Sequence, residues 1–131
     1  MASLPEIVAL IACSLGAGMG LYGLINPQWA ARLVRLRAAE GQPGGFAEFR
    51  ATYGGMFLFT HAAAIFGVLA TGPSFSAIFC FPVAALWAGA GIGRTLSMLL
   101  DGTRTPFNLM SVVFELGMAV AIGLPLILFL T

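Results

Sequence analysis

The chain has 131 residues, of which 60% are hydrophobic and only 8% are charged. Soluble globular domains carry about 25% charged residues, so a chain this apolar would expose large apolar patches to water. The formal net charge is +1, and the six basic residues, all arginines, form no continuous basic stripe, which argues against a nucleic-acid partner. Length and composition therefore predict a single integral membrane domain over residues 1–131, with the lipid bilayer as its solvent.

Four apolar stretches follow one another along the chain, at about residues 4–25, 51–70, 75–100 and 107–130. Each is close to the roughly 20 residues that an α-helix needs to cross a hydrocarbon layer about 30 Å thick. The sequence lacks the alternation of polar and apolar residues that is typical of a membrane β-barrel. It therefore predicts an all-α fold, a four-transmembrane-helix bundle whose backbone polar groups are satisfied within each helix.

Turn-forming residues separate these stretches. The first stretch has no basic residues before it and is long enough to span, so we expect it to be retained rather than cleaved as a signal peptide. Asn26-Pro27 ends the first helix, and Gly72-Pro73 forms a tight connection between the second and third. A short turn at residues 101–106 joins the third to the fourth, and Gly102 there can adopt the left-handed conformation that stops a helix.

The arginines gather in two of the three connections. Arg37 and Arg50 belong, with two further arginines, to the connection at residues 26–50, and Arg94 and Arg104 lie at the connection between the third and fourth helices. Cytoplasmic connections of membrane proteins carry an excess of basic residues. This rule places both connections in the cytoplasm and both termini on the outer face of a bacterial inner membrane.

The segment from Pro27 to about Ala39 reads as a short interfacial amphipathic helix between the first two spans. Its apolar side chains Trp29, Leu33 and Leu36 recur at helical spacing, while its arginines point elsewhere. Trp29, Arg32 and Arg35 would form an interfacial anchor, the arginines meeting anionic lipid. The alternative is a docking site for a partner. A flexible loop at residues 41–45 follows.

Small residues recur four apart on three of the expected helices, which lets helix backbones approach closely. The rows are Ala12, Gly16 and Gly20 on the first helix, Ala85, Gly89, Gly93 and Ser97 on the third, and Ser111, Ala119 and Gly123 on the fourth, with Glu115 in the same row. Two interpretations stay open: packing within the bundle, or the interface of a homodimer.

Two charged residues, Arg94 and Glu115, lie within the expected spans. A charge at the centre of a membrane is costly, so such residues usually have a partner. Arg94 lies roughly 9 Å, and Glu115 roughly 12 Å, from the cytoplasmic end of its helix at 1.5 Å per residue. Because the two helices are consecutive and antiparallel, the sequence predicts an ion pair between Arg94 and Glu115, in which the guanidinium fork matches the carboxylate.

Further polar residues at the same end of the spans extend this pair into a predicted polar cluster. Its members are Arg50, Tyr53, Arg94, Asp101, Asn108, Ser111 and Glu115. Three interpretations stay open for it: a structural network that fixes helix register, a site for an anionic lipid headgroup or small polar ligand, and a proton or ion pathway in which Glu115 titrates.

The remaining reactive side chains give no motif for catalysis, a metal or a cofactor. His61 stands alone near the middle of the second helix, where a neutral ring bonded to a backbone carbonyl is the plain interpretation and a proton relay the alternative. Cys13 and Cys80 lie in apolar runs and are expected to be buried, with a disulfide as the minor alternative. The sequence therefore favours a protein that is not an enzyme and holds no metal or cofactor.

The runs Arg50-Ala51-Thr52-Tyr53-Gly54-Gly55 and Arg94-Thr95-Leu96-Ser97 with Asp101-Gly102, followed by Glu115 in the last helix, resemble one known family. They are similar to the bacterial small membrane proteins grouped as DUF4345, a domain of unknown function with four predicted helices that is loosely similar to DoxX-like membrane proteins. The resemblance covers nearly the whole chain and implies a four-helix bundle without implying an activity. The likeness to DoxX implies an association with membrane redox systems.

Three functional hypotheses remain at this point. The first is a non-enzymatic inner-membrane protein that binds a lipid or small amphiphile, or supports a membrane complex, through the polar cluster. The second is a small dimeric proton-coupled transporter, although the intramembrane Glu of such exporters lies in the first helix, where this chain has only Glu6 near the outer end. The third is an accessory subunit of a membrane redox system.

Overall fold

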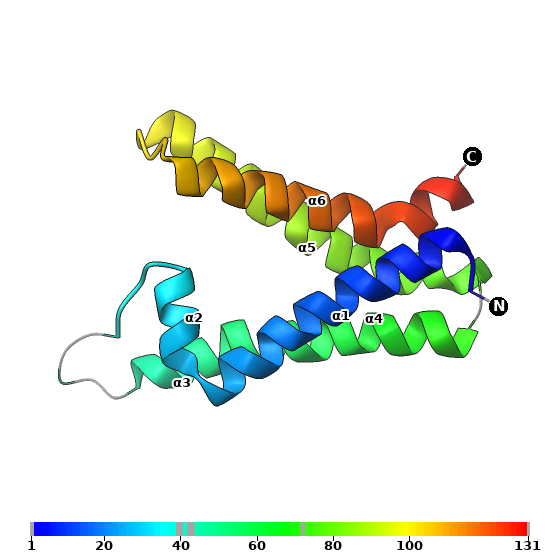
Figure 1. Cartoon of the computed structure of the whole chain (residues 1–131), viewed down its shortest axis with the longest axis horizontal. Coiled ribbons are helices and arrows are strands. Elements are labelled where there is room, and N and C mark those ends of the chain that lie inside the picture. Colours follow the sequence, from blue (N-terminus) through cyan, green and yellow to red (C-terminus); the bar gives the residue numbers. More distant parts are fainter. Residues whose placement is uncertain (1, 39–40, 42–43, 72, 131) are drawn as a thin grey trace. The chain divides into compact units, whose positions relative to one another are not determined.

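The computed structural model of the chain describes residues 2–38, 41, 44–71 and 73–130, and of residues 73, 74, 128 and 129 the backbone alone. Its described part is helical, with short connections and no strand (Figure 1). The helices are α1 (Leu4–Ile25), α2 (Pro27–Leu33), α3 (Gly45–Phe49), the π-helix η1 (Arg50–Met56), α4 (Phe57–Thr71), α5 (Pro73–Leu100) and α6 (Pro106–Phe129).

The predicted fold class is confirmed. Four helical stretches are long and apolar enough to cross a membrane, and a short helix, α2, lies between the first two. The second stretch differs from the sequence-based expectation, because it begins at Gly45 rather than near Ala51 and runs continuously through α3, η1 and α4 to Thr71. Arg50 therefore lies inside this helix rather than at its start.

The chain divides into two compact units, which are described separately here. The first unit comprises Met1–Ala12 and Phe66–Thr131, and the second comprises Cys13–Ile65. The prediction of one domain over the whole chain, and the loop predicted at residues 41–45, stay predictions. That loop and the Gly72-Pro73 connection include residues outside the described part.

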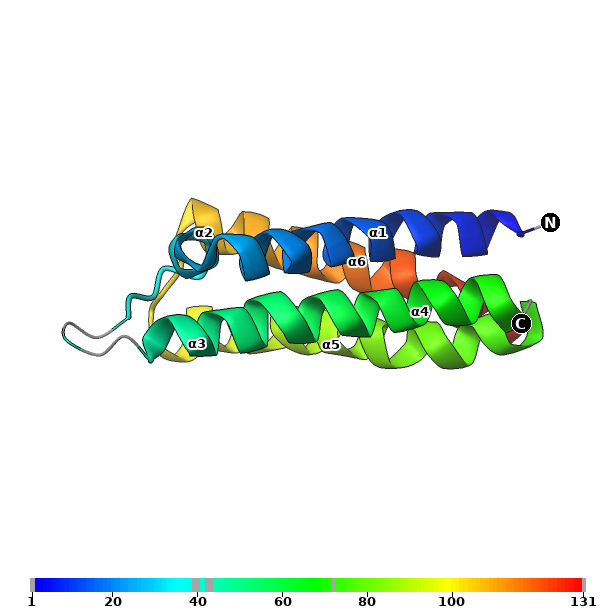
Figure 2. The same cartoon turned by 90° about the horizontal axis from the view of Figure 1, so that it is seen from below.

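In the first unit, α5 and α6 form an antiparallel pair joined by the turn at residues 101–105, and they lie side by side in both views (Figures 1 and 2). Trp87 and Phe114 meet edge to face across this pair, with ring centroids 5.6 Å apart. Close approach of the two helices depends on Gly91, where an added Cβ would lie 2.8 Å from Cδ2 of Leu116. Gly91 thus allows α5 to lie close to α6 at Leu116.

This use of Gly91 corrects one sequence-based expectation. The row predicted to pack on the third helix was Ala85, Gly89, Gly93 and Ser97. The first three are exposed in the structure, and the hydroxyl of Ser97 lies 3.0 Å from that of Thr103 in the following turn. A Cβ added at Gly89 or Gly93 would meet nothing within 4 Å. Bulky side chains that α5 buries, such as Trp87, set the rotation of this helix and turn the predicted row outward, and the homodimer interface stays a prediction.

In the second unit, the glycines of α1 make room for η1 and α4. A Cβ at Gly16 would overlap the imidazole of His61, and a Cβ at Gly20 would overlap the backbone of Leu58. The side chain of Arg50 reinforces this contact, because its Nε donates a hydrogen bond to the backbone carbonyl of Leu24 at 3.0 Å. The row of small residues predicted on the first helix is therefore an internal packing surface in this unit.

The short helix α2 differs in length from the amphipathic helix expected over residues 27–39. Asn26 caps its start by accepting a hydrogen bond from the backbone N–H of Trp29 at 3.1 Å, and Pro27 occupies the first turn. The helix ends at Leu33, and Arg35 has a φ of 59° in the left-handed region. Leu36 therefore lies beyond the helix, and the expected apolar line through Trp29, Leu33 and Leu36 is interrupted.

Candidate polar site

The turn between α5 and α6 holds the polar residues of the first unit in place. Gly102 has a φ of 67°, as predicted for a residue that stops the preceding helix. The hydroxyl groups of Ser97 and Thr103 lie 3.0 Å apart and share a hydrogen bond across the turn. Thr105 then caps α6, because its hydroxyl accepts a hydrogen bond from the backbone N–H of Asn108 at 3.2 Å.

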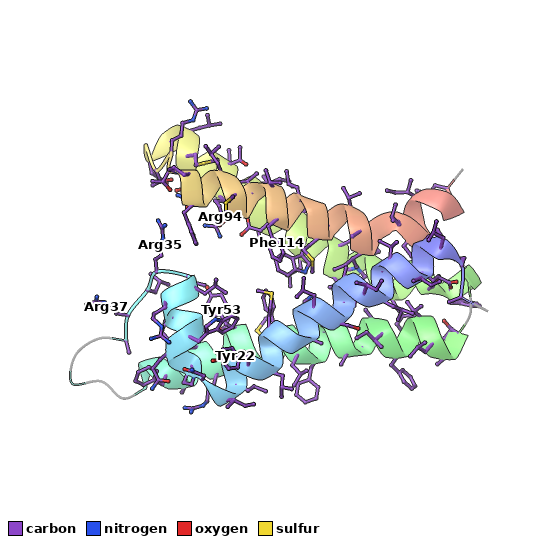
Figure 3. All side chains as sticks on the ribbon, in the orientation of Figure 1. Tyr22, Arg35, Arg37, Tyr53, Arg94 and Phe114 are labelled. Carbon is purple, nitrogen blue, oxygen red and sulfur yellow. The ribbon has the colours of Figure 1, made fainter. Side chains whose placement is uncertain are left out.

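Arg94 and Glu115 form the ion pair that the sequence predicts. Nη2 of Arg94 donates to Oε1 of Glu115 at 2.6 Å, and Nε of Arg94 lies 3.1 and 3.0 Å from the two carboxylate oxygens. Figure 3 shows Arg94 on α5 beside α6. Two N–H groups of one guanidinium thus meet one carboxylate in the fork geometry that gives such pairs their strength and directionality.

Asn108 connects this pair to the turn. Its amide nitrogen donates to the backbone carbonyl of Thr103 at 2.7 Å, and its amide oxygen accepts a long hydrogen bond from Nη1 of Arg94 at 3.4 Å. The guanidinium is therefore oriented from two sides, by Glu115 and by a side chain that is itself held by the turn. Ser111 lies one helical turn before Glu115, but its hydroxyl donates to the carbonyl of Phe107 at 2.9 Å.

The two charged partners differ in exposure. The side chain of Glu115 is 8% exposed, whereas the side chain of Arg94 is 33% exposed. Removing a carboxylate from water costs several kcal/mol unless a cation compensates it, and Arg94 supplies that cation. The pair therefore joins a buried carboxylate to an arginine whose side chain remains partly exposed.

Of the other three members of the predicted cluster, one lies in the first unit and two in the second, and their place in the cluster stays a prediction. Asp101 is exposed at the end of α5, and the structure shows no ion pair between it and Arg94, both of which belong to its described part. Arg50 and Tyr53 belong to the second unit. There the ring of Tyr53 lies between those of Phe49 and Phe57, at centroid distances of 6.0 and 6.4 Å.

His61 is fully buried in the second unit, and its Nδ1 lies 2.6 Å from the backbone carbonyl of Phe57. Because a carbonyl oxygen can only accept, Nδ1 carries the hydrogen of this bond. This is the plain arrangement that the sequence suggests for a lone histidine, and the role of proton relay stays a prediction. Among the predicted anchors, Trp29 packs edge to face on Tyr22 at 4.9 Å.

The structure also reveals a buried carboxylate that the sequence analysis passed over. Glu6 is only 3% exposed, and its Oε2 accepts hydrogen bonds from the backbone N–H and the hydroxyl of Ser3, at 2.7 and 2.9 Å. A side-chain hydrogen bond with the buried Ser76 ties the start of α1 to α5. The spacing of Ser3 and Glu6 ahead of an apolar run is typical of a capping box and could have identified this interaction.

Gly91 was missed for a different reason. It lies three residues before Arg94, so the two residues share one face of α5. A Cβ at Gly91 would lie 2.8 Å from Cδ2 of Leu116 and 3.6 Å from Cβ of Glu115, so Gly91 lies directly beside the carboxylate-bearing residue of the ion pair. Gly91 does not belong to the row of small residues four apart, and its spacing of three residues from Arg94 is the signal that could have identified it.

The polar groups at this site are of kinds that bind ligands through hydrogen bonds. A guanidinium, an amide and hydroxyl groups surround one buried carboxylate at this site. The guanidinium, amide and hydroxyl groups can donate hydrogen bonds to a headgroup rich in acceptor oxygens. Within the described residues, no three His, Cys, Asp or Glu side chains are grouped so that they could hold a metal ion. Cys13 and Cys80 are buried free thiols.

Comparison with known proteins gives one match. The model of a family described as a domain of unknown function (DUF4345) matches residues 6–126 of the chain. No curated protein and no solved structure matches it. The match spans both units and every helix described above.

Proposed function

The chain belongs to the DUF4345 family, whose function is unknown, and we propose that it is a non-enzymatic membrane protein that binds a lipid or small amphiphile at Arg94. The headgroup of this ligand would supply acceptor oxygens to the guanidinium, and its apolar part would lie along the surrounding helices. The main observation behind this proposal is that the buried Glu115 orients Arg94, while a third of the Arg94 side chain remains exposed.

Two physical arguments support binding over a purely structural pair. Part of the Arg94 side chain remains exposed while Arg94 holds Glu115, so this arginine can meet the acceptor oxygens of a ligand without breaking the pair. A preoriented arginine also loses less side-chain entropy when it binds, because Glu115 and Asn108 already hold the guanidinium plane. The guanidinium of Arg94 is therefore preorganised to bind an acceptor group of a ligand.

The position of the site along its helix suggests where the ligand enters. Arg94 lies roughly 9 Å from the end of α5 at 1.5 Å per residue, so it lies within reach of the headgroup layer. We propose that this end faces the cytoplasm, since the arginine-bearing connections lie there by the positive-inside rule, and that both termini lie on the outer face of an inner membrane. A ligand would then come from the cytoplasmic leaflet.

The test is native mass spectrometry of the full chain extracted directly into lipid nanodiscs, which detects the masses that stay bound. We expect the wild-type protein to retain one amphiphile or lipid class. Arg94→Lys should lose it, because lysine keeps the charge but lacks the planar fork. Glu115→Gln should retain it more weakly, since the guanidinium persists without its orienting charge.

Arg104→Gln is the matched control, because Arg104 is an exposed arginine in the neighbouring turn. It should retain the ligand, and circular dichroism of each variant checks that the helices persist. If wild type, Arg94→Lys and Arg104→Gln carry the same masses in the same amounts, Arg94 is not the binding site and the proposal fails.

A further inference from the structure

We propose that the arginine turn, defined as residues 32–37 at the end of α2, is a binding surface for the phosphate groups of anionic phospholipids. This surface belongs to the second unit and shares no residue with the site at Arg94. Three features of the turn support this: its backbone conformation, its positive charge, and the packing that fixes α2.

The turn has a backbone conformation that favours glycine and nevertheless contains an arginine. The N–H of Leu36 donates to the carbonyl of Ala31 at 3.0 Å, and the N–H of Arg35 donates to the carbonyl of Arg32 at 3.2 Å. These two bonds form a Schellman motif, in which the left-handed residue is usually glycine. Arg35 occupies that position with a φ of 59°. Because glycine adopts this conformation more easily, replacing Arg35 by glycine can remove the charge without straining the turn.

The surface of the turn combines positive charge with apolar side chains. Arg32, Arg35 and Arg37 are exposed, and the sequence between residues 27 and 38 contains no acidic residue. Leu33 and Leu36 are 39% and 57% exposed beside them. Guanidinium groups bind phosphates through two parallel hydrogen bonds, and exposed leucines bury into the acyl boundary. This combination is complementary to an anionic headgroup layer rather than to water alone.

The base of the turn is fixed, so the arginines are not carried on a loose tail. Ala30 and Ala31 of α2 are buried together with Phe49, and Trp29, Val34, Phe46 and Tyr53 pack against them. Figure 3 shows Arg35 and Arg37 on the segment that follows the end of α2. A fixed base reduces the entropy lost when the turn binds lipid.

The test uses Trp29, which lies on α2, as the reporter. The chain has two tryptophans, so Trp87→Phe leaves Trp29 as the single one. The full chain is reconstituted in phosphatidylcholine vesicles that contain increasing fractions of brominated phosphatidylglycerol, and quenching of Trp29 gives the relative binding constant. We expect phosphatidylglycerol to be favoured on the order of fivefold for each arginine engaged. The preference should fall as the salt concentration rises.

Arg35→Gly in the same background is the decisive variant. It should reduce the preference for phosphatidylglycerol on the order of fivefold. It should leave the free energy of unfolding unchanged or higher, because glycine suits the left-handed position. Arg37→Gln, which alters no constrained backbone position, should reduce the preference similarly.

Three results would overturn the proposal. One is equal quenching by brominated phosphatidylglycerol and brominated phosphatidylcholine, which would leave the turn as a plain apolar anchor or as a docking site for an acidic protein. Another is an unchanged preference in both Arg35→Gly and Arg37→Gln. The last is an equal loss in Arg104→Gln, which removes the same charge from another turn and would attribute the preference to net charge alone.

Discussion

Breaking the ion pair from its two ends should destabilise the protein unequally. Among the residues that the structure describes, Arg94 is the only ion-pair partner of Glu115, whose side chain is 8% exposed, and Arg94→Ala removes it. Glu115→Gln instead leaves an oxygen that still accepts a hydrogen bond from Arg94, whose side chain is 33% exposed. Arg94→Ala therefore leaves the buried charge of Glu115 without its cation, and Glu115→Gln leaves the partly exposed charge of Arg94 without its anion.

The expected magnitudes follow from this asymmetry. Removing one partner of a buried pair costs about 3–5 kcal/mol, so we expect Arg94→Ala to lower the free energy of unfolding by about that amount. Glu115→Gln exchanges a charged hydrogen bond for a neutral one and should cost about 1–2 kcal/mol. The double variant Arg94→Met with Glu115→Leu removes both charges at similar volume, so it should return to within about 1 kcal/mol of the wild type.

The assay is unfolding of the purified protein by sodium dodecyl sulfate in mixed micelles, followed by circular dichroism, for the wild type, both single variants and the double variant. The four free energies give the coupling between the two side chains. Equal losses in the two single variants, or a double variant as unstable as Arg94→Ala, would refute the reasoning, since each result would mean that no uncompensated buried charge is created.

Two further predictions use the same unfolding assay. Gly16→Ala should lower the free energy of unfolding by about 1–3 kcal/mol, because its Cβ overlaps the His61 ring. Gly18→Ala should raise it by about 0.5–1 kcal/mol, because the Cβ there meets nothing within 4 Å and alanine favours the helix. Similar effects of the two substitutions would contradict the proposed close packing. Gly102→Ala should cost about 1 kcal/mol, because the φ of 67° is a left-handed conformation that alanine adopts only with strain, and an unchanged stability would mean that the turn adapts.

The sequence by itself determined the four long apolar helices and the ion pair between α5 and α6. Helices that cross lipid satisfy their backbone hydrogen bonds within one segment, so the length and apolarity of each stretch suffice to predict it. The depth of Arg94 and Glu115 follows from counting residues along two consecutive helices, and the cost of an isolated charge in lipid leaves few partners for either residue. The left-handed Gly102 likewise follows from its local position after a helix.

Only the tertiary structure decided how each helix is rotated and where α2 ends. Periodicity identifies rows of small residues but not the row that meets a neighbour, and packing of bulky side chains selected Gly91 while leaving Gly89 and Gly93 exposed. The sequence pattern continued the amphipathic helix past Leu33, but the chain turns at Arg35, where hydrogen bonds close the helix in a conformation that an arginine does not favour. These outcomes depend on contacts between residues far apart in the chain or on backbone strain, and neither is encoded in local spacing.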